Sequence, residues 1–574
     1  MVDETLREFY DSLTREEAAM AEWIAADEYG LVMRIAINEM DLELEGVHRN
    51  GPATDEDHQR AYLMRLGVNR VIKLALDAHP QFIAPTWTVQ RKLAASAPVL
   101  ALISDLGKIG HGRRVAQSLA ARSGRIEKRG DGYGIILPAR VVDDEMHERE
   151  LDEYYVQRGR REFELGPQAY VDAKIGDEVR SLLTELVYPY GQHFIGYESD
   201  PALDVYFYGR GYNEIQLAKG YDAFHFSTRF GGMTFQHYKL AAAFILQSGH
   251  RHRAFVQALL EKDRTIRIED VLTVSGETSS YLENMRDFIN YWGEAREGHV
   301  PVTEEGVRIL FDVLSVSRRN RALLDRPGAP IPPLVQCSEE HVIKVLSGAN
   351  ADILLFLLNS LQHHFPKDYD RAQREREGVM QRGVEGMLRS ALADLGFRGN
   401  IKLRQNGKVL TDLDLVAVDA SADRVILFQL KHQDHYGADL ATMLSRTARL
   451  NQQVSEWLVK VRAWLAAATA SEVRATLRLP TAAARPTVSL MVVTRHFAHS
   501  LRSVVDGGDA AFSNWAQLAT ATARMRDEPE AGSLDRLIAI LRELSVPEEK
   551  FYLPEPPSEW RVGELCFTIE QIEE

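Results

Sequence analysis

The stretch that decides the fold of the C-terminal part is TDLDLVAVDASADRVILFQLKHQD, residues 411–434. Two apolar runs flank a polar turn, which is typical of a β-hairpin. Four polar side chains interrupt the apolar runs: Asp412, Asp414, Gln429 and Lys431. Burying polar or charged groups without partners is costly, so their presence requires a structural or chemical reason.

Strand alternation predicts how these four side chains meet. Asp412 and Asp414 share one face of the first strand, and Gln429 and Lys431 share one face of the second. With the turn centred on residues 421–422, antiparallel pairing places Asp414 opposite Gln429 and Asp412 opposite Lys431, at the distance of cross-strand neighbours.

Two interpretations follow from this placement. In the first, the face is solvated and Asp412 pairs with Lys431 in a surface ion pair worth about 0–1 kcal/mol. In the second, the face lines a cleft where oxygen ligands bind a hard divalent cation and the lysine orients or activates a water molecule. The continuous apolar run RVILFQLK, residues 424–431, is typical of a strand buried on both faces and favours the second interpretation.

The same residues resemble the core motif of the PD-(D/E)xK nuclease superfamily, over about residues 370–500. Asp414 corresponds to the motif's first acid, and Gln429-Leu430-Lys431 to its acid-x-Lys half, with Gln in place of the acid. This QxK form is similar to that of Mrr-like restriction endonucleases. Glu385, in RGVEGMLRSALADLGF, corresponds to the glutamate that family members often carry on the preceding helix.

The resemblance implies a catalytic set of Asp414, Gln429, Lys431 and Glu385. It implies Mg²⁺, with Mn²⁺ able to substitute, held by Asp414, Gln429, Glu385 and the backbone carbonyl of Leu430. Lys431 would hold the attacking water or stabilise developing charge. Gln429 leaves the metal one fewer negative ligand than the usual motif.

The implied function is metal-dependent endonuclease hydrolysis of phosphodiester bonds, in DNA, with RNA left open. Four basic residues near the motif are expected to contact phosphates: Arg382, Arg389, Lys402 and Arg404. A nuclease unit attached to a long unrelated region resembles bacterial anti-phage defence or restriction effectors, which implies part of a multi-protein defence complex. Cutting both strands of DNA commonly requires two active sites, so a homo-oligomer is the other expectation. The alternative is a catalytically inactive nuclease fold that binds nucleic acid or assembles a complex.

A weaker match lies on the following helix. RecB-type members carry QxxxY there, and this chain offers Gln453 and Trp457. A helix-surface amide and a core tryptophan would explain these two residues equally well.

The surrounding pattern predicts an α/β unit of order α-β-β-β-α-β. A helix from residue 369 is expected to end at Gly396, followed by strands at about 399–405, 409–418 and 424–432. A helix over 437–468 and a strand from residue 487 follow. The predicted domains are 1–148, mainly helical; 149–366, mixed α/β of unknown role; and 367–574, a restriction-endonuclease-like α/β domain with a C-terminal extension.

The first domain reads as helices followed by a Gly-containing hairpin at residues 125–138, similar to the end of a winged helix. In the second, the aromatic- and glycine-rich residues 204–230 are expected to contain strands. The fold class predicted is therefore multidomain, from a helical N-terminal part through a mixed middle part to the C-terminal α/β domain.

Composition sets further bounds. The 574 residues carry a formal net charge of −15, which argues against coating nucleic acid by bulk attraction. Only two cysteines occur, Cys337 and Cys566, which argues against a disulfide framework and favours a reducing, cytoplasmic location. No run of 18 apolar residues occurs, so no membrane span is expected.

Overall fold

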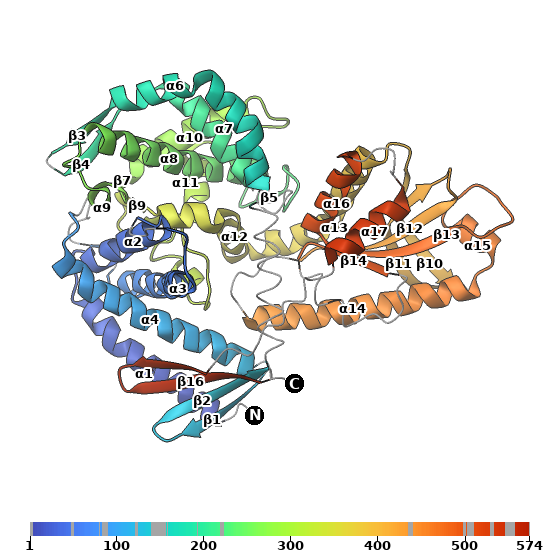
Figure 1. Ribbon diagram of the computed structural model, residues 1–574, viewed down its shortest axis with the longest axis horizontal. Coiled ribbons are helices and arrows are strands. Elements are labelled where there is room, and N and C mark those ends of the chain that lie inside the picture. Colours follow the sequence, from blue (N-terminus) through green and yellow to red (C-terminus); the bar gives the residue numbers. More distant parts are fainter. Residues whose placement is uncertain are drawn as a thin grey trace.

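The structure is a computed structural model. It describes residues 4–47, 51–79, 81–82, 90–120, 124–138, 157, 159–191, 193–217, 223–433, 440–496, 501, 510–527, 533–545 and 557–572. The chain forms a mixed α/β arrangement of three units, with the C-terminal unit extending to one side of the other two (Figure 1).

The first unit is a helical layer beside a small sheet. Its elements are α1 (Glu4–Ala25), α2 (Leu31–Leu44), α3 (Asp55–Ala78), α4 (Leu93–Ala120), β1 (Arg125–Arg129) and β2 (Gly132–Pro138). Helices α3 and α4 approach closely because Gly67 and Gly107 lack side chains. A Cβ on Gly67 would come within 2.0 Å of the Ile103 carbonyl oxygen.

Helix α4 is long and apolar enough to cross a membrane, yet residues such as Ile103 and Leu106 pack it inside this unit.

The end of the described chain completes the sheet of the first unit. Strands β15 (Ser558–Val562) and β16 (Leu565–Ile572) form an antiparallel hairpin, and β16 pairs in parallel with β2, in the order β1-β2-β16-β15 (Figure 1). The predicted domain boundaries placed these residues in the C-terminal domain instead. Their burial explains the difference, since Phe567 packs against Phe9 of α1 in the first core.

His111 of α4 lies in the contact between this helix and the C-terminal hairpin. Its ring lies 4.7 Å from the Trp560 ring and its Nδ1 is 3.1 Å from the Tyr62 hydroxyl. Burial, with a smaller contribution from the charge of Arg114, lowers the pKa of His111 to about 3.

Because the unfolded chain takes up a proton at the ordinary histidine pKa of about 6.5 and the folded chain does not, stability should fall below pH 6.5. We expect His111 to contribute up to about 1.4 kcal/mol of lost unfolding free energy per pH unit between pH 6 and 4. Denaturant unfolding of His111→Gln should show a shallower loss over this range. An unchanged slope would contradict the assignment.

The middle unit is mainly helical, with three small sheets. Its elements are η1 (Glu164–Gln168), α6 (Ala169–Leu186), β3 (Val187–Tyr190), β4 (Phe194–Tyr197), α7 (Pro201–Leu217), β5 (Arg229–Phe230), β6 (Met233–Thr234), α8 (Phe235–Lys262), α9 (Ile268–Val271), β7 (Ser275–Glu277), α10 (Thr278–Gly293), α11 (Glu304–Val313), η3 (Arg321–Leu324), β8 (Leu334–Gln336), β9 (His341–Lys344) and α12 (Leu346–His364). The expectation of strands over residues 204–230 is wrong for α7. There Tyr208, Tyr212 and Ile215 recur at helical spacing and pack in the core of this unit.

The first and middle units are joined by a buried carboxylate. Asp41 of α2, fully buried, accepts hydrogen bonds from the Ser347 backbone N–H at 2.8 Å, the Ser347 hydroxyl at 2.6 Å and the Thr273 hydroxyl at 2.8 Å. Ser347 lies in the first turn of α12, whose own N-cap residue supplies no side-chain hydrogen bond. One unit therefore caps a helix of the other.

The C-terminal unit is a five-stranded sheet between two helical layers. Its elements are α13 (Pro366–Ala391), β10 (Gly396–Gln405), β11 (Lys408–Asp419), β12 (Arg424–Lys431), α14 (Leu440–Ala467), α15 (Ala470–Thr476), β13 (Thr487–Thr494), β14 (Ala510–Asn514), α16 (Trp515–Asp527) and α17 (Leu534–Ser545). The strand order is β10-β11-β12-β13-β14, with β12, β13 and β14 parallel. Helix α14 covers one face, and α13, α16 and α17 cover the other (Figure 1).

The predicted element order α-β-β-β-α-β is confirmed for this unit, except that the short helix α15 stands between α14 and β13. The helix boundaries differ from the prediction, because α13 begins at Pro366 and ends at Ala391, and Gly396 instead begins β10. Leu392 has an extended backbone, with φ −139° and ψ 90°, and so ends the helix. Strand β14 and helices α15 and α16 were not predicted. Residues 437–439 of the predicted second helix lie outside the described part of the chain.

Candidate active site

The hairpin of residues 411–434 forms in the predicted register. Strands β11 and β12 pair antiparallel from Asp419–Arg424 to Leu415–Phe428. The ladder ends there, although β12 continues beside β13 as far as Lys431. The two strands therefore separate at Asp414, and the separation forms a fork in the sheet.

A change in strand alternation accompanies the fork. Leu415 and Ala417 pack in the core under α13, whereas Leu413, which alternation places with them, packs in the core under α14. On the neighbouring strand, Asn400 has a left-handed backbone with φ 53° and interrupts the ladder opposite Asp414. Asparagine adopts this conformation at low cost. The whole end of the β10–β11 hairpin thus reverses its faces, with Asp414 at the reversal.

The carboxylate of Asp414 takes the place of a backbone partner at the fork. Its Oδ2 accepts the Leu430 backbone N–H at 2.6 Å and a hydrogen bond from Gln429 Nε2. In a continued ladder, the Leu413 carbonyl would have met Leu430. The predicted juxtaposition of Asp414 and Gln429 is therefore observed as a direct contact, and Gln429 is only 5% exposed.

This arrangement also determines the directions of two further oxygen atoms, the Gln429 amide oxygen and the Leu430 carbonyl oxygen. Because Gln429 donates through Nε2, its amide oxygen is left for another partner. The Lys431 carbonyl faces β13, where it accepts the Arg495 N–H at 2.9 Å. The peptide groups of Leu430 point to the opposite side, so its carbonyl shares the fork with Asp414.

Lys431 follows on the same face of β12 as Gln429, and it is partly buried. Its ammonium forms no ion pair with any residue that the structure describes. The predicted pairing of Lys431 with Asp412 is wrong. Strand β11 has already left β12 at this point and its faces are reversed, so the Asp412 side chain is exposed.

Glu385 lies on the helical layer that covers this side of the sheet. Its Oε1 accepts a hydrogen bond from Gln381 Nε2 at 3.0 Å, one helical turn earlier on α13. Gln381 in turn lies directly over Gly399 of β10, where a Cβ would come within 2.4 Å of Nε2. Gly399 pairs with Leu415, beside Asp414. The described contacts bring Glu385 to the neighbourhood of the fork through Gln381, without a direct contact to Asp414.

The pair proposed on α14 divides into one interior residue and one surface residue. Trp457 is 3% exposed, and its indole N–H donates to the Asp412 carbonyl at 2.9 Å. Gln453 is exposed. Neither Gln381 nor the hydrogen bond of Trp457 was identified as part of the site, because helix spacing gives no sign of which strand atom a side chain meets.

The basic residues near the fork have different environments. The four expected to contact phosphates are all exposed: Arg382, Arg389, Lys402 and Arg404. Arg376, in the same basic stretch of sequence, is instead 2% exposed. It stacks 3.9 Å from the Phe224 ring of the middle unit and donates to the Tyr369 hydroxyl at 3.0 Å.

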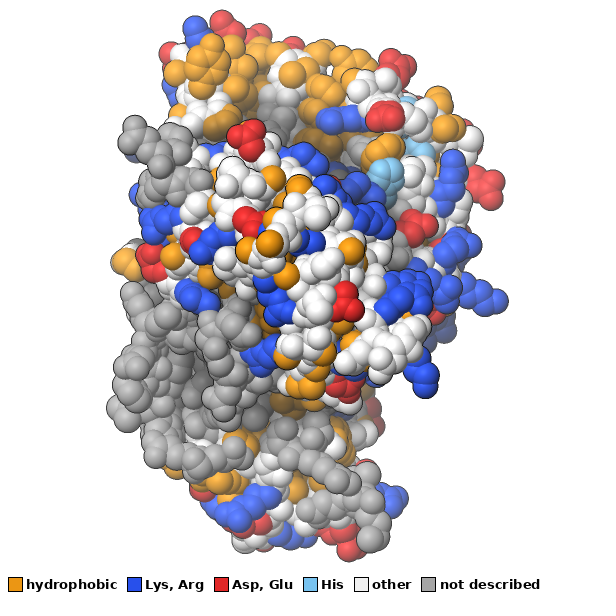
Figure 2. All heavy atoms as spheres, turned by 90° about the vertical axis from the view of Figure 1, so that its right-hand side faces the viewer, with side chains coloured by type: hydrophobic (Ala, Val, Ile, Leu, Met, Phe, Trp, Pro, Cys, Tyr) orange, Lys and Arg blue, Asp and Glu red, His pale blue; other side chains and the backbone are white. Residues whose placement is uncertain are grey.

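A positive balance distinguishes this unit from the rest of the chain. Residues 366–545 carry 25 Lys and Arg against 21 Asp and Glu, a net of +4, in a chain of net charge −15. Figure 2 views the end of the unit that lies to the right in Figure 1, and Lys and Arg are prominent there, with few acidic side chains between them. An anionic polymer would therefore meet its most favourable field on this unit.

Beyond Lys431, buried basic side chains gather where β12 and β13 end. Burial, and the nearby charges of Arg376, Arg495 and His496, hold the pKa of His432 well below its usual value. Arg495 and His496 are 5% and 3% exposed. Arg376, whose charge acts on His432, also contacts Phe224 of the middle unit.

The oxygen donors at the fork suit a hard cation such as Mg²⁺. Among the residues that the structure describes, no three His, Cys, Asp or Glu side chains gather to hold a metal. The predicted set has only two carboxylates, Asp414 and Glu385, and its remaining donors are an amide and a backbone carbonyl.

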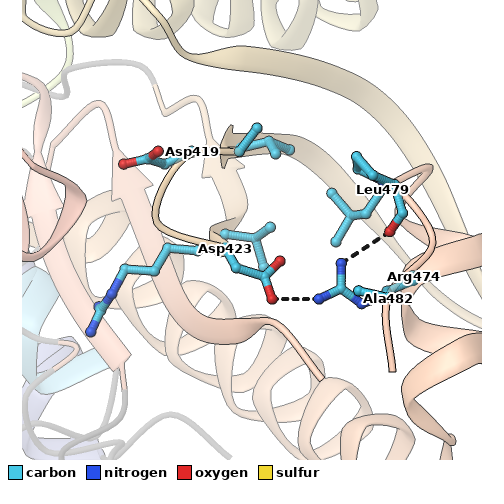
Figure 3. A pocket seen from close by; sticks show the side chains of 10 residues that line it. Asp419, Asp423, Arg474, Leu479 and Ala482 are labelled. Carbon is cyan, nitrogen blue, oxygen red and sulfur yellow. Dashed lines mark hydrogen bonds and ion pairs between the residues drawn. The ribbon is translucent and has the colours of Figure 1, made fainter. Parts of the chain in front are cut away.

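A hollow of about 250 Å³ lies at the opposite end of the sheet, beside the β11–β12 turn (Figure 3). Its polar groups are engaged within the protein. Arg474 donates to the carbonyls of Ala484 at 2.7 Å and Pro480 at 3.0 Å, and pairs with Asp423. Asp419 accepts the backbone N–H groups of the turn. This hollow is therefore explained by support of the loop after α15.

No family model, no curated protein and no solved structure matches this chain.

Proposed function

We propose that this chain is a metal-dependent nuclease that hydrolyses phosphodiester bonds in DNA. The observation that carries the proposal is the fork at Asp414. There the Asp414 carboxylate contacts the Gln429 side chain and the Leu430 backbone between two separating strands. Lys431, which forms no ion pair with any described residue, is next on the same face of β12. The order of elements and the resemblance of the motif to the PD-(D/E)xK superfamily support the same proposal.

The residues at the fork would divide the work of hydrolysis. Asp414, the Gln429 amide oxygen and the Leu430 carbonyl would hold Mg²⁺, with Glu385 adding negative charge from α13. When bound, the ion would neutralise charge on the scissile phosphate and lower the pKa of a water molecule. Lys431 would hold the attacking water, whose oxygen bonds to phosphorus as the bond to the leaving sugar oxygen breaks. The proton that the water loses would end on that leaving oxygen.

The proposal is tested by incubating the purified chain with supercoiled plasmid, linear duplex, single strands and RNA, in Mg²⁺ and in EDTA. We expect cleavage of DNA in Mg²⁺ only. Equal binding of DNA with and without the ion, and no cleavage of any substrate, would contradict the proposal and favour a non-catalytic scaffold. Cleavage of RNA alone would correct the substrate.

Gln429→Glu tests the unusual donor of the motif. Since Gln429 now donates to Asp414, a glutamate would place two carboxylates in contact, and we expect a lower Tm in EDTA. The added charge should strengthen metal binding, so Mg²⁺ should raise Tm more than in wild type. Plasmid cleavage should persist, and its complete loss would assign the amide a role that a carboxylate cannot fill.

A further inference from the structure

The fork depends on where the end of β11 is held. A strand that leaves its partner exposes peptide groups that need new partners. The Asp412 carbonyl finds one in the indole N–H of Trp457, at 2.9 Å, from the helix on the α14 face. Two residues later, the Asp414 carboxylate occupies the position at Leu430 that a continued ladder would fill.

These two contacts are coupled through the strand. Leu413, between Asp412 and Asp414, packs in the core to which Trp457 belongs. With Leu413 and the Asp412 carbonyl both turned to α14, the β11 backbone cannot pair with β12 at Leu430. The carboxylate of Asp414 is then the group that reaches Leu430 and Gln429.

We infer that Trp457 is a positioning residue of the candidate site, acting through the Asp412 carbonyl to hold the fork open. The expected effect of Trp457 on cleavage rests on the proposed function. Its expected effect on the separation of β11 from β12 rests on the observed fork alone. Trp457 itself contributes no metal ligand and no group to the reaction.

The variant Trp457→Phe removes the N–H and keeps most of the aromatic volume. Trp464→Phe is the matched control, since Trp464 is on the same helix, 4% exposed and in the same core. Both variants lose similar packing, so a purely structural role would affect them alike. Only Trp457→Phe should alter the fork.

Two readouts separate the inference from the proposed function. Hydrogen exchange, followed by mass spectrometry over residues 411–415 and 428–432, should speed up at least about tenfold in Trp457→Phe and stay at the wild-type rate in Trp464→Phe. Mn²⁺ titration should show about 10–100-fold weaker binding in Trp457→Phe alone, the range found when a group that orients a metal ligand is lost. Cleavage should show a lower kcat with little change in KM for DNA.

Unchanged exchange at the fork in Trp457→Phe would overturn the inference, whatever the chain does to DNA. Equal acceleration in both variants would also overturn it, because the effect would then be one of packing. If exchange responds as expected and the wild type binds no Mn²⁺ and cuts nothing, the fork is held by Trp457 and the proposed function fails.

Discussion

Replacing Lys431 by alanine should abolish DNA cleavage and leave the fold intact. Its ammonium forms no ion pair within the described structure, so the free energy of unfolding should change by about 0.5 kcal/mol or less. If this ammonium holds the attacking water or the developing charge, the cleavage rate should fall by at least about 100-fold, as for other charge-stabilising groups. Single-turnover plasmid nicking and thermal unfolding measure the two quantities.

Lys460→Ala is the matched control for this variant. Lys460 lies exposed on α14 and, among the residues that the structure describes, forms an ion pair with Glu456 alone, at 3.7 Å. It should cleave like wild type and unfold at nearly the same temperature. Cleavage by Lys431→Ala at the wild-type rate would contradict the assignment of Lys431 as a catalytic residue.

The second large effect is expected at Asp414. Asp414→Asn keeps the shape of the side chain and an oxygen that can accept the Leu430 N–H, so the fork should persist at a stability cost of about 1 kcal/mol. The negative charge is lost, and Mn²⁺ or Mg²⁺ binding should become undetectable by calorimetry, together with cleavage. The metal-induced rise in Tm should also disappear.

Asp412→Asn provides the comparison within the same motif. The two acids are two residues apart, yet the Asp412 side chain is exposed, and Asp412 contacts Trp457 through its backbone carbonyl. It should retain metal binding and cleavage. If Asp412→Asn loses the metal and Asp414→Asn does not, the principal ligand has been assigned to the wrong carboxylate.

The contact between Asp414 and Gln429 was predictable from the sequence, but the contacts that separate strand β11 from β12 were not. Two apolar runs around a polar turn specify a hairpin register, and that register brings Asp414 to Gln429. The placement of Asp412 failed because alternation was assumed to continue through the strand. The alternation of β11 reverses instead. That reversal depends on the left-handed backbone of Asn400, on strand β10, and on Trp457, on helix α14.

The same distinction, between features set by local pattern and features set by distant contacts, holds for the whole fold. Long amphipathic helices and the α-β-β-β-α-β order were readable because each carries its own periodicity. The aromatic-rich sequence of α7 indicated strands because aromatic residues favour strands. Its helical spacing is evident only once the core that these side chains contact is known. The partner of β16 was unpredictable from local pattern, since it lies at the other end of the chain.

That last pairing has a consequence for biosynthesis. Strand β2 ends at Pro138, and its partner β16 begins only at Leu565. At about 5–20 residues per second, translation would take some 20–85 s to pass from one to the other. During that interval β2 presents an open edge of the kind that invites pairing with other chains. The sheet β10–β14, which carries the fork, emerges from the ribosome earlier, so the N-terminal sheet closes last. Conditions that slow translation late in the message should therefore lower the yield of soluble protein.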